Sequence, residues 1–258
     1  MLVTSMPKRE RIMRKKIWSE YAMLLIVAAV IYFLQEAISK INWAAASLFD
    51  YSAIDSSGVF MMVSVHHVLL ALFSLLLMAV LHRTKHLAFG LKPLIDQKAI
   101  QYTVVYCTLI FVYYVFWYMV VGVLLNSISG VDYALTRGNV IGTLGFQLLL
   151  SGPAEELWFR GLSVTCLQAV CAETKKTTSA FILFLSSLLF MMAHMKWSAP
   201  ISSQWYSLLY VFLNGIAFGF VYMKTKHLVY PMVMHSISNV VSVGGCYLYM
   251  ILLRNPPV

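Results

Sequence analysis

Charged side chains are scarce in this sequence. Only 11% of its 258 residues are Asp, Glu, Lys or Arg, whereas 60% are hydrophobic, and the mean hydropathy is +0.78. Soluble globular domains carry about 25% charged residues, so this composition excludes an ordinary soluble domain. We also find no low-complexity tract and no convincing internal repeat. The sequence therefore predicts an all-α, polytopic transmembrane helical bundle that forms a single domain over residues 1–258.

Cysteine is rare as well, and its placement excludes two further classes of protein. The four cysteines show neither CxxC spacing nor clustering, which argues against a disulfide framework or a zinc knuckle. They are Cys107, Cys166, Cys171 and Cys246.

The formal net charge of +9 does not indicate a nucleic-acid partner, because many of the basic residues stand ahead of the first apolar run. We expect residues 1–16 to be a basic cytoplasmic segment that touches anionic lipid headgroups. The long apolar run behind them lacks an obvious small-residue cleavage site, which predicts a retained anchor rather than a cleaved signal peptide.

Hydrophobic runs long enough to cross a bilayer recur along the whole chain. Lysine and arginine are enriched in every second connector, which predicts a cytoplasmic amino terminus and a carboxyl terminus on the other side. We expect seven spans, at roughly 17–38, 60–81, 100–125, 139–170, 178–195, 204–223 and 228–252.

The fourth run is too long for one simple span. The order Ser151, Gly152, Pro153 is typical of a helix start, with Ser151 as the cap and proline in the first turn. We therefore expect a fresh helix from about residue 152, with its positive dipole end near the acids that follow. Residues 139–150 would then form a separate short helix, giving seven or eight membrane helices.

The most informative residues are the charged ones inside these apolar runs. An ionised side chain near the bilayer centre costs about 3 kcal/mol on insertion scales, so such residues tend to be functional. Glu155 and Glu156 are adjacent, and Arg160 lies four residues after Glu156 on the same helical face. We expect Arg160 to neutralise Glu156 while Glu155 stays available; a purely structural ion pair would not explain the second acid.

Histidine and asparagine supply the remaining polar groups of interest. His235 and Asn239 share one face of the last span, where both could donate hydrogen bonds to an oxyanion or, alternatively, join two helices. His194 ends the fifth span, and taken alone it reads as an interfacial residue. We interpret the adjacent pair His66 and His67 as polar packing or interface residues.

The small residues Gly215 and Gly219 predict close helix packing in the sixth span. Together the acids and histidines suggest hydrolysis of an amide. A Glu with two His could also bind a divalent metal that activates the water, although no HExxH helix is present.

At these residues the sequence resembles the CPBP family of intramembrane proteases, the CAAX-protease and bacteriocin-processing (Abi) proteins. The family signatures EExxxR, FxxxH and HxxxN/D correspond to Glu155-Glu156 with Arg160, Phe190 with His194, and His235 with Asn239. The resemblance covers about residues 139–245, which would form the catalytic core.

The resemblance implies a role for each matched residue. Glu155 would activate water with the help of His194, Glu156 and Arg160 would support the site, and His235 with Asn239 would stabilise the oxyanion. It leaves two alternatives for the cofactor: a zinc-like divalent metal held by Glu155, His194 and His235, or a glutamate-activated water without metal.

The family and the short chain imply a bacterial plasma-membrane endopeptidase. Its substrate would be a membrane-associated peptide or protein, as in pheromone or bacteriocin maturation or self-immunity, with the lipid bilayer as its surroundings and no nucleic-acid partner. A prenylated substrate is not expected of a bacterial member. Two other classes stay open: a non-catalytic bacteriocin-immunity protein that binds its target, and a small transporter with the acids as a proton site.

One expectation conflicts with this site. Straight spans would put His194 near the outer end of its helix and His235 within two turns of the inner end. At 1.5 Å per residue the two would lie about 10–15 Å apart. Bends at Pro153 and Pro231, or different span ends, would have to bring them together.

Overall fold

The computed structural model describes residues 8–92, 95–128, 130–171 and 175–254, with side chains from residue 18 to residue 253. All regular secondary structure within these ranges is helical. The α-helices are α1 Lys8–Ala46, α2 Met61–Lys85, α3 Gln97–Trp117, α4 Arg137–Phe146, α5 Gly152–Glu156, α6 Thr165–Ala169, α7 Lys176–Ala193, α8 Ile201–Thr225 and α9 Val229–Tyr249. Four π-helical segments continue or join them: η1 Tyr118–Leu124, η2 Gln147–Ser151, η3 Leu157–Val164 and η4 Met250–Arg254.

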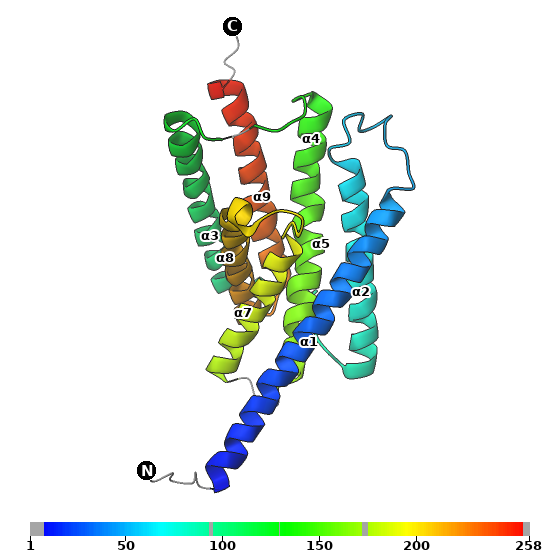
Figure 1. Ribbon diagram of the computed structural model, residues 1–258, viewed down its shortest axis with the longest axis vertical. Helices are drawn as coiled ribbons and strands as arrows, with labels where there is room; N and C mark the ends of the chain where they lie inside the picture. The colour runs from blue at the N-terminus through cyan, green and yellow to red at the C-terminus, as the bar shows by residue number, and fades with distance from the viewer. Residues whose placement is uncertain (1–7, 93–94, 129, 172–174, 255–258) are drawn as a thin grey trace.

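These helices form the all-α membrane bundle that the composition predicts. Six of them are long and apolar enough to cross a membrane, and the column from α4 to α6 makes one further crossing through the bundle (Figure 1). The chain starts α1 at one end of the molecule and finishes η4 at the other. Each of the seven predicted spans corresponds to a helix or to the column from α4 to α6, with shifted ends, but α7 ends near mid-height and does not run the full height of the bundle. The basic segment lies partly outside the described residues: 8–16 extend α1, without described side chains.

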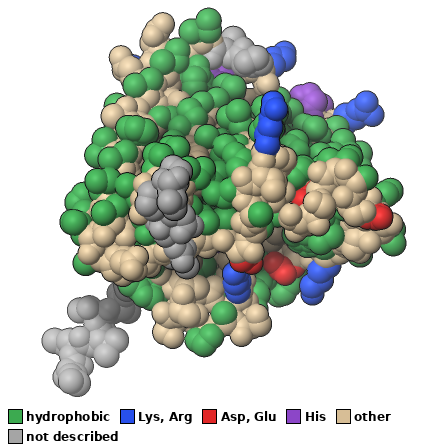
Figure 2. Space-filling model, turned by 90° about the horizontal axis from the view of Figure 1, so that it is seen from above, with side chains coloured by type: hydrophobic (Ala, Val, Ile, Leu, Met, Phe, Trp, Pro, Cys, Tyr) green, Lys and Arg blue, Asp and Glu red, His purple; other side chains and the backbone are tan. Residues whose placement is uncertain are grey.

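The outer surface suits a lipid environment. Large hydrophobic side chains point outward along the spans, for example Phe33, Leu109 and Leu149. Viewed from one end, the outline of the molecule is mostly hydrophobic, with few charged side chains (Figure 2). Burial is instead concentrated between the helices, around Trp158, Tyr222 and their neighbours.

The expected helix start at residue 152 is wrong. Ser151 has helical backbone angles, φ −58° and ψ −62°, and its side chain makes no cap hydrogen bond. The chain instead runs from Arg137 to Ala169 as one column in which α-helical and π-helical turns alternate. A true helix start would leave several N–H groups unpaired at membrane depth, which is costly. The π turn directly before Pro153 widens the helix, so a residue that lacks an N–H is accommodated without a break.

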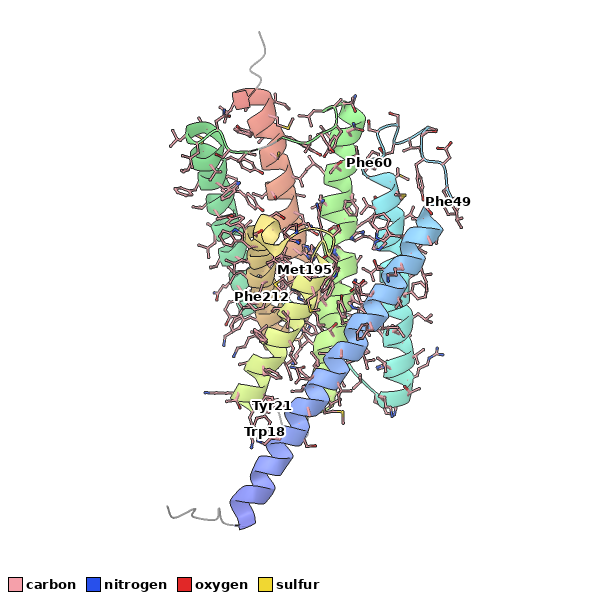
Figure 3. The ribbon with its side chains drawn as sticks, viewed as in Figure 1. Trp18, Tyr21, Phe49, Phe60, Met195 and Phe212 are labelled. Carbon is pink, nitrogen blue, oxygen red and sulfur yellow. The ribbon has the colours of Figure 1, made fainter. Side chains whose placement is uncertain are left out.

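Helices α7 and α8 pack closely through small residues, as the sequence predicts. A Cβ added to Gly215 would come within 3.0 Å of Ser187 Cβ, and one added to Gly219 within 2.6 Å of Leu183 Cδ1. The turn between the two helices lies near mid-height of the molecule, where Met195 is labelled in Figure 3. The carboxyl end of helix α7 therefore lies in the interior of the bundle.

The connector before α2 is fixed by one carboxylate. Asp55 is buried, and its side chain accepts hydrogen bonds from the backbone N–H groups of Val59, Phe60 and Met61 at 2.9, 2.7 and 2.7 Å. Burial alone would raise the pKa of Asp55, but these donors, together with the N–H of Gly58, lower it below its usual range. Asp55 thus anchors the start of the helix that carries His66 and His67.

Candidate active site

The two adjacent glutamates on α5 face different partners. Glu156 is fully buried, and its Oε1 accepts hydrogen bonds from Arg160 Nη1 at 2.7 Å and from His235 Nδ1 at 2.9 Å. The expected ion pair between residues four apart is therefore present. Glu155 makes no contact with Arg160 in this arrangement and turns toward α2 and the end of α7.

Aromatic rings enclose the Arg160 guanidinium. Its Cζ lies 4.4 Å from the ring centroid of Phe190 and 5.2 Å from that of Phe218, and Nη2 donates to the Gly215 carbonyl at 3.3 Å. Phe190, the phenylalanine of the FxxxH pattern, therefore covers the buried guanidinium and keeps the ion pair away from water.

His235 is held in place by the same ion pair. Its ring stacks on Phe218 with centroids 5.0 Å apart and lies 5.6 Å from Phe190. Because Glu156 already pairs with Arg160 as a carboxylate, His235 Nδ1 donates its hydrogen to Glu156 Oε1. The other ring nitrogen, Nε2, is then a donor only in the imidazolium form, so His235 can stabilise an oxyanion only when it is protonated.

The two oxygens of Glu155 have unequal surroundings. Oε1 accepts from His67 Nε2 at 3.1 Å and from Ser151 Oγ at 3.4 Å. Oε2 is buried and has no hydrogen-bond partner among the described residues. The nearest histidine nitrogen on that side is His194 Nε2 at 3.6 Å, beyond a direct hydrogen bond. Glu156 Oε2 is likewise buried without a partner among the described residues, so what distinguishes Glu155 Oε2 is the histidine nitrogen that faces it.

His194 occupies the carboxyl end of α7, where the chain leaves the helix. Its Nδ1 donates to the Phe190 carbonyl at 2.9 Å, and its ring lies against the Phe190 ring with centroids 4.7 Å apart. In the neutral form Nε2 is therefore an acceptor directed toward Glu155. The side chain is 35% exposed, against 12% for Glu155, so the site opens on the His194 side.

Asn239 joins the cluster through a serine. Its Nδ2 donates to Ser151 Oγ at 3.0 Å, and the same hydroxyl donates to Glu155 Oε1. The side chain expected to cap a helix thus links α9 to the acid on α5. Close approach of the two helices makes this link, because a Cβ on Gly152 would meet the Ser236 backbone nitrogen at 2.8 Å.

The seven residues of the three patterns therefore gather in one cluster, with Glu155 and Glu156 at its centre. The 10–15 Å separation expected for straight spans does not occur. His194 and His235 both lie within 6 Å of Phe190, measured between ring centroids. The reason is that α7 ends near mid-height, so the depth assigned to His194 from a simple span was wrong.

The described residues contain no group of three His, Cys, Asp or Glu side chains arranged to hold a metal ion. The set considered from the sequence was Glu155, His194 and His235. In the structure Glu155 and His194 face each other at 3.6 Å, but the three side chains are not arranged as a metal-holding group. Of the two alternatives, the chemistry below follows the one that uses only the protein's own groups.

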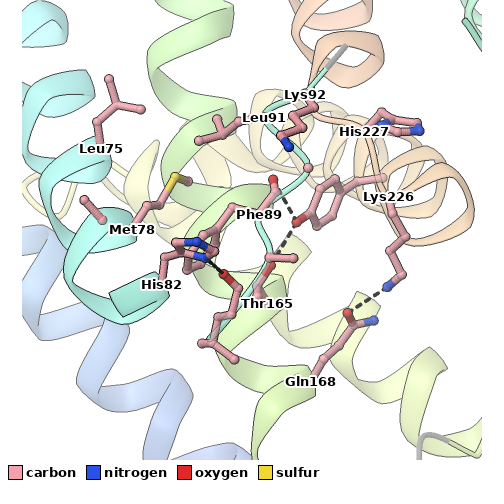
Figure 4. Close-up of a pocket in the computed structure, with 15 residues that line it drawn as sticks. Leu75, Met78, His82, Phe89, Leu91, Lys92, Thr165, Gln168, Lys226 and His227 are labelled. Carbon is pink, nitrogen blue, oxygen red and sulfur yellow. Dashed lines mark hydrogen bonds between the residues drawn. The ribbon is translucent and has the colours of Figure 1, made fainter. Parts of the chain in front are cut away.

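Two cavities in the described part of the chain lie away from this cluster. One of about 790 Å³ is bordered by the end of α2, residues 86–92 and the end of α8, and Lys226 there donates to Gln168 at 2.8 Å (Figure 4). The other, about 670 Å³ and almost entirely apolar, lies between α3, α4 and α9. Neither is lined by a motif residue, so the site is a buried polar cluster between packed helices.

Sequence reasoning missed two participants. His67 was interpreted as packing and Ser151 as a helix cap, yet both bond to Glu155. One reason to expect a role for His67 was present in the sequence, because a histidine pair inside an apolar span needs polar partners. The sequence contained no indication that the partner was an acid 88 positions away.

Comparison with known families agrees with the patterns in the sequence. Residues 137–241 match the family model described as type II CAAX prenyl endopeptidase Rce1-like. No curated protein and no solved structure gives a significant match. All seven motif residues lie inside the matched segment, whereas His67 lies outside it.

Proposed function

We propose that the protein hydrolyses a peptide bond within the bilayer, with Glu155 as the general base, because residues 137–241 of this multi-span chain match the Rce1-like CAAX endopeptidase family model. The observation that carries this proposal is the asymmetry of Glu155. One carboxylate oxygen is held by two donors, and the other is unpaired and faces His194.

The gap between Glu155 Oε2 and His194 Nε2 gives the attacking water its place. At 3.6 Å the two atoms are too far apart for a direct hydrogen bond, and one water can donate to both. A water that donates both hydrogens leaves its lone pairs free for the substrate carbonyl. As its oxygen bonds to the carbonyl carbon, one proton passes to Glu155. When the carbon–nitrogen bond breaks, Glu155 returns that proton to the leaving amine.

The negative charge on the carbonyl oxygen needs donors on the opposite side. Asn239 supplies an amide N–H without any change of charge, since only one of its two hydrogens is used by Ser151. His235 adds a charge-assisted donor at Nε2 once protonated, with Glu156 holding its Nδ1. Glu156 and Arg160 contribute indirectly, because their buried ion pair sets the position of His235 and of the α5 backbone.

Three finer features of the proposal come from the sequence. We place the protein in a bacterial plasma membrane with a cytoplasmic amino terminus, on the strength of its charge pattern and size. The substrate class is a membrane-associated peptide or protein, such as a pheromone or bacteriocin precursor or a self-immunity target. We do not expect the substrate to be prenylated, although the matched family model is described as type II CAAX prenyl endopeptidase Rce1-like.

The test compares peptides from host cells that carry wild type, Glu155→Gln or His194→Ala, with protein amounts matched by blotting. Glu20→Gln is the control, since it makes the same chemical change on α1, outside the cluster. We expect a peptide product that wild type and the control form and both site variants lose. In lipid nanodiscs, the purified protein is then given an internally quenched CAAX peptide in farnesylated and unmodified form, which tests the prenyl requirement directly.

The same experiment separates the rival functions. A non-catalytic immunity protein would keep its protective phenotype in Glu155→Gln with an unchanged peptide profile. A proton-coupled transporter would show flux that depends on a pH gradient and no peptide product. Either result, with folded protein, would overturn the protease proposal.

A further inference from the structure

The Glu155 carboxylate is bonded by a residue from outside the Rce1-like segment. His67 stands on α2, and its Nε2 lies 3.1 Å from Glu155 Oε1, the closest contact that this carboxylate makes among the described residues. The three family patterns do not include it, and the mechanism proposed above counts it as a donor to Glu155 without giving it a step.

We infer that His67 is a positioning residue for Glu155: it holds Oε1 in place and so reserves Oε2 for the attacking water. The inference rests on the proposed function, because it assigns a role within that reaction. It also extends the site to the amino-terminal half of the chain.

The His67 ring is fixed from two directions before it meets Glu155. Its Nδ1 donates to the Val63 carbonyl one turn earlier at 2.8 Å, and its face meets the edge of the Phe146 ring with centroids 4.9 Å apart. A carbonyl and a carboxylate can only accept, so both ring nitrogens of His67 carry a hydrogen in this arrangement and the ring is an imidazolium. With Nδ1 held by Val63, Nε2 is directed at α5.

The effect on Glu155 is to fix the rotation of the carboxylate group. The terminal torsion of a glutamate is broad, so an unrestrained carboxylate would present either oxygen to the water. His67 and Ser151 both bond to Oε1, and no described residue bonds to Oε2. His67 therefore helps to decide which oxygen of Glu155 is left facing His194.

The neighbouring histidine provides a matched control. His66 is equally buried on the same helix, but it pairs with Ser39 Oγ at 3.2 Å and stacks on Trp43 with centroids 4.5 Å apart. Its Nδ1 lies 3.4 Å from His67 Nδ1, but no hydrogen bond joins it to Glu155. Removing either imidazole empties a similar volume on α2, yet only the His67 change removes a donor to the Glu155 carboxylate.

The experiment measures kcat and KM of the full-length protein in nanodiscs, with whichever of the two quenched CAAX peptides the wild type cleaves. The variants are His67→Leu, His67→Gln, His67→Asn and His66→Leu, each checked for folding by its thermal unfolding profile. Glutamine can place an N–H where imidazole Nε2 stands, whereas the shorter asparagine cannot reach it. His67→Leu should lower kcat by about 10–100-fold with little change in KM. His67→Gln should regain most of the loss, and His66→Leu should resemble wild type.

Each outcome decides the inference. If folded His67→Leu keeps its kcat, or if His66→Leu loses as much, His67 has no positioning role while the protease function stands. If His67→Leu does not fold, glutamine and asparagine still differ in reach, and equal kcat values for the two would overturn the inference. If wild type and Glu155→Gln both leave the two peptides intact, the proposed function fails and the inference fails with it.

Discussion

Replacing Arg160 with methionine would leave the Glu156 carboxylate in an apolar interior with His235 as its remaining partner among the described residues. Both members of the ion pair are fully buried, so solvent does not screen their interaction. Methionine fills much of the space that the arginine stem occupied and still contacts Phe190, which keeps the packing change small.

The magnitude follows from the contact distance. At 2.7 Å, with an effective dielectric constant of about 20, the attraction between the two charges is ~6 kcal/mol before desolvation is subtracted. Removing one partner of a buried pair typically costs about 3–5 kcal/mol, because the other charge is left uncompensated. The double variant Glu156→Gln, Arg160→Met buries no charge, so we expect it to be more stable than Arg160→Met alone.

The assay is equilibrium unfolding in mixed micelles of wild type, both single variants and the double variant, followed by tryptophan fluorescence. The four free energies of unfolding give the coupling energy between the two residues. Peptide cleavage measured on the same samples should remain low in the double variant, since His235 loses its carboxylate acceptor. A loss below about 1 kcal/mol for Arg160→Met, or strictly additive single effects, would refute the reasoning about the buried pair.

Gly152→Ala should lower both stability and cleavage, because its Cβ would meet the Ser236 backbone. Gly161→Ala should be milder, because its Cβ would meet side-chain ends alone, those of Met78 and Leu228; thermal unfolding and kcat measure the difference. Asp55→Asn should cost about 1 kcal/mol at neutral pH by weakening the anchor of α2. Because the folded pKa of Asp55 is lowered, the wild-type advantage should be complete above about pH 4, the unfolded value, and disappear as the pH falls through the folded pKa; an advantage that grows on acidification would contradict this. Asn239→Leu should lower kcat by about 100-fold while the protein stays folded, and an unchanged kcat would remove Asn239 from the oxyanion site.

Much of the fold could be predicted from local features of the sequence. Each of the seven hydrophobic runs corresponds to a helix or to the helical column from α4 to α6, because bilayer thickness sets the length that an apolar segment needs. The pairing of Glu156 with Arg160 was equally accessible, since residues four apart on one helix are neighbours in any tertiary context. The close approach at Gly215 and Gly219 follows from the same kind of local rule.

The local rules for helix starts gave a wrong prediction at Pro153. The order Ser151, Gly152, Pro153 satisfies every sequence criterion for a helix start, yet the chain stays helical through it. Helix capping assumes that water or side chains satisfy the free backbone groups. Between packed membrane helices, a π turn that keeps most backbone hydrogen bonds is the less costly solution.

The sequence by itself determined which residues are available for chemistry: three spaced patterns of acids, histidines and an asparagine in a chain with few other polar groups at membrane depth. Only the tertiary structure decided which of them meet. Helix α7 ends at mid-height and brings His194 to Glu155, and α2 brings His67 to the same carboxylate across 88 positions of sequence. Helix periodicity fixes neighbours within a few turns, whereas contacts between helices depend on where each helix ends and on the small residues that let it approach, which no single segment encodes.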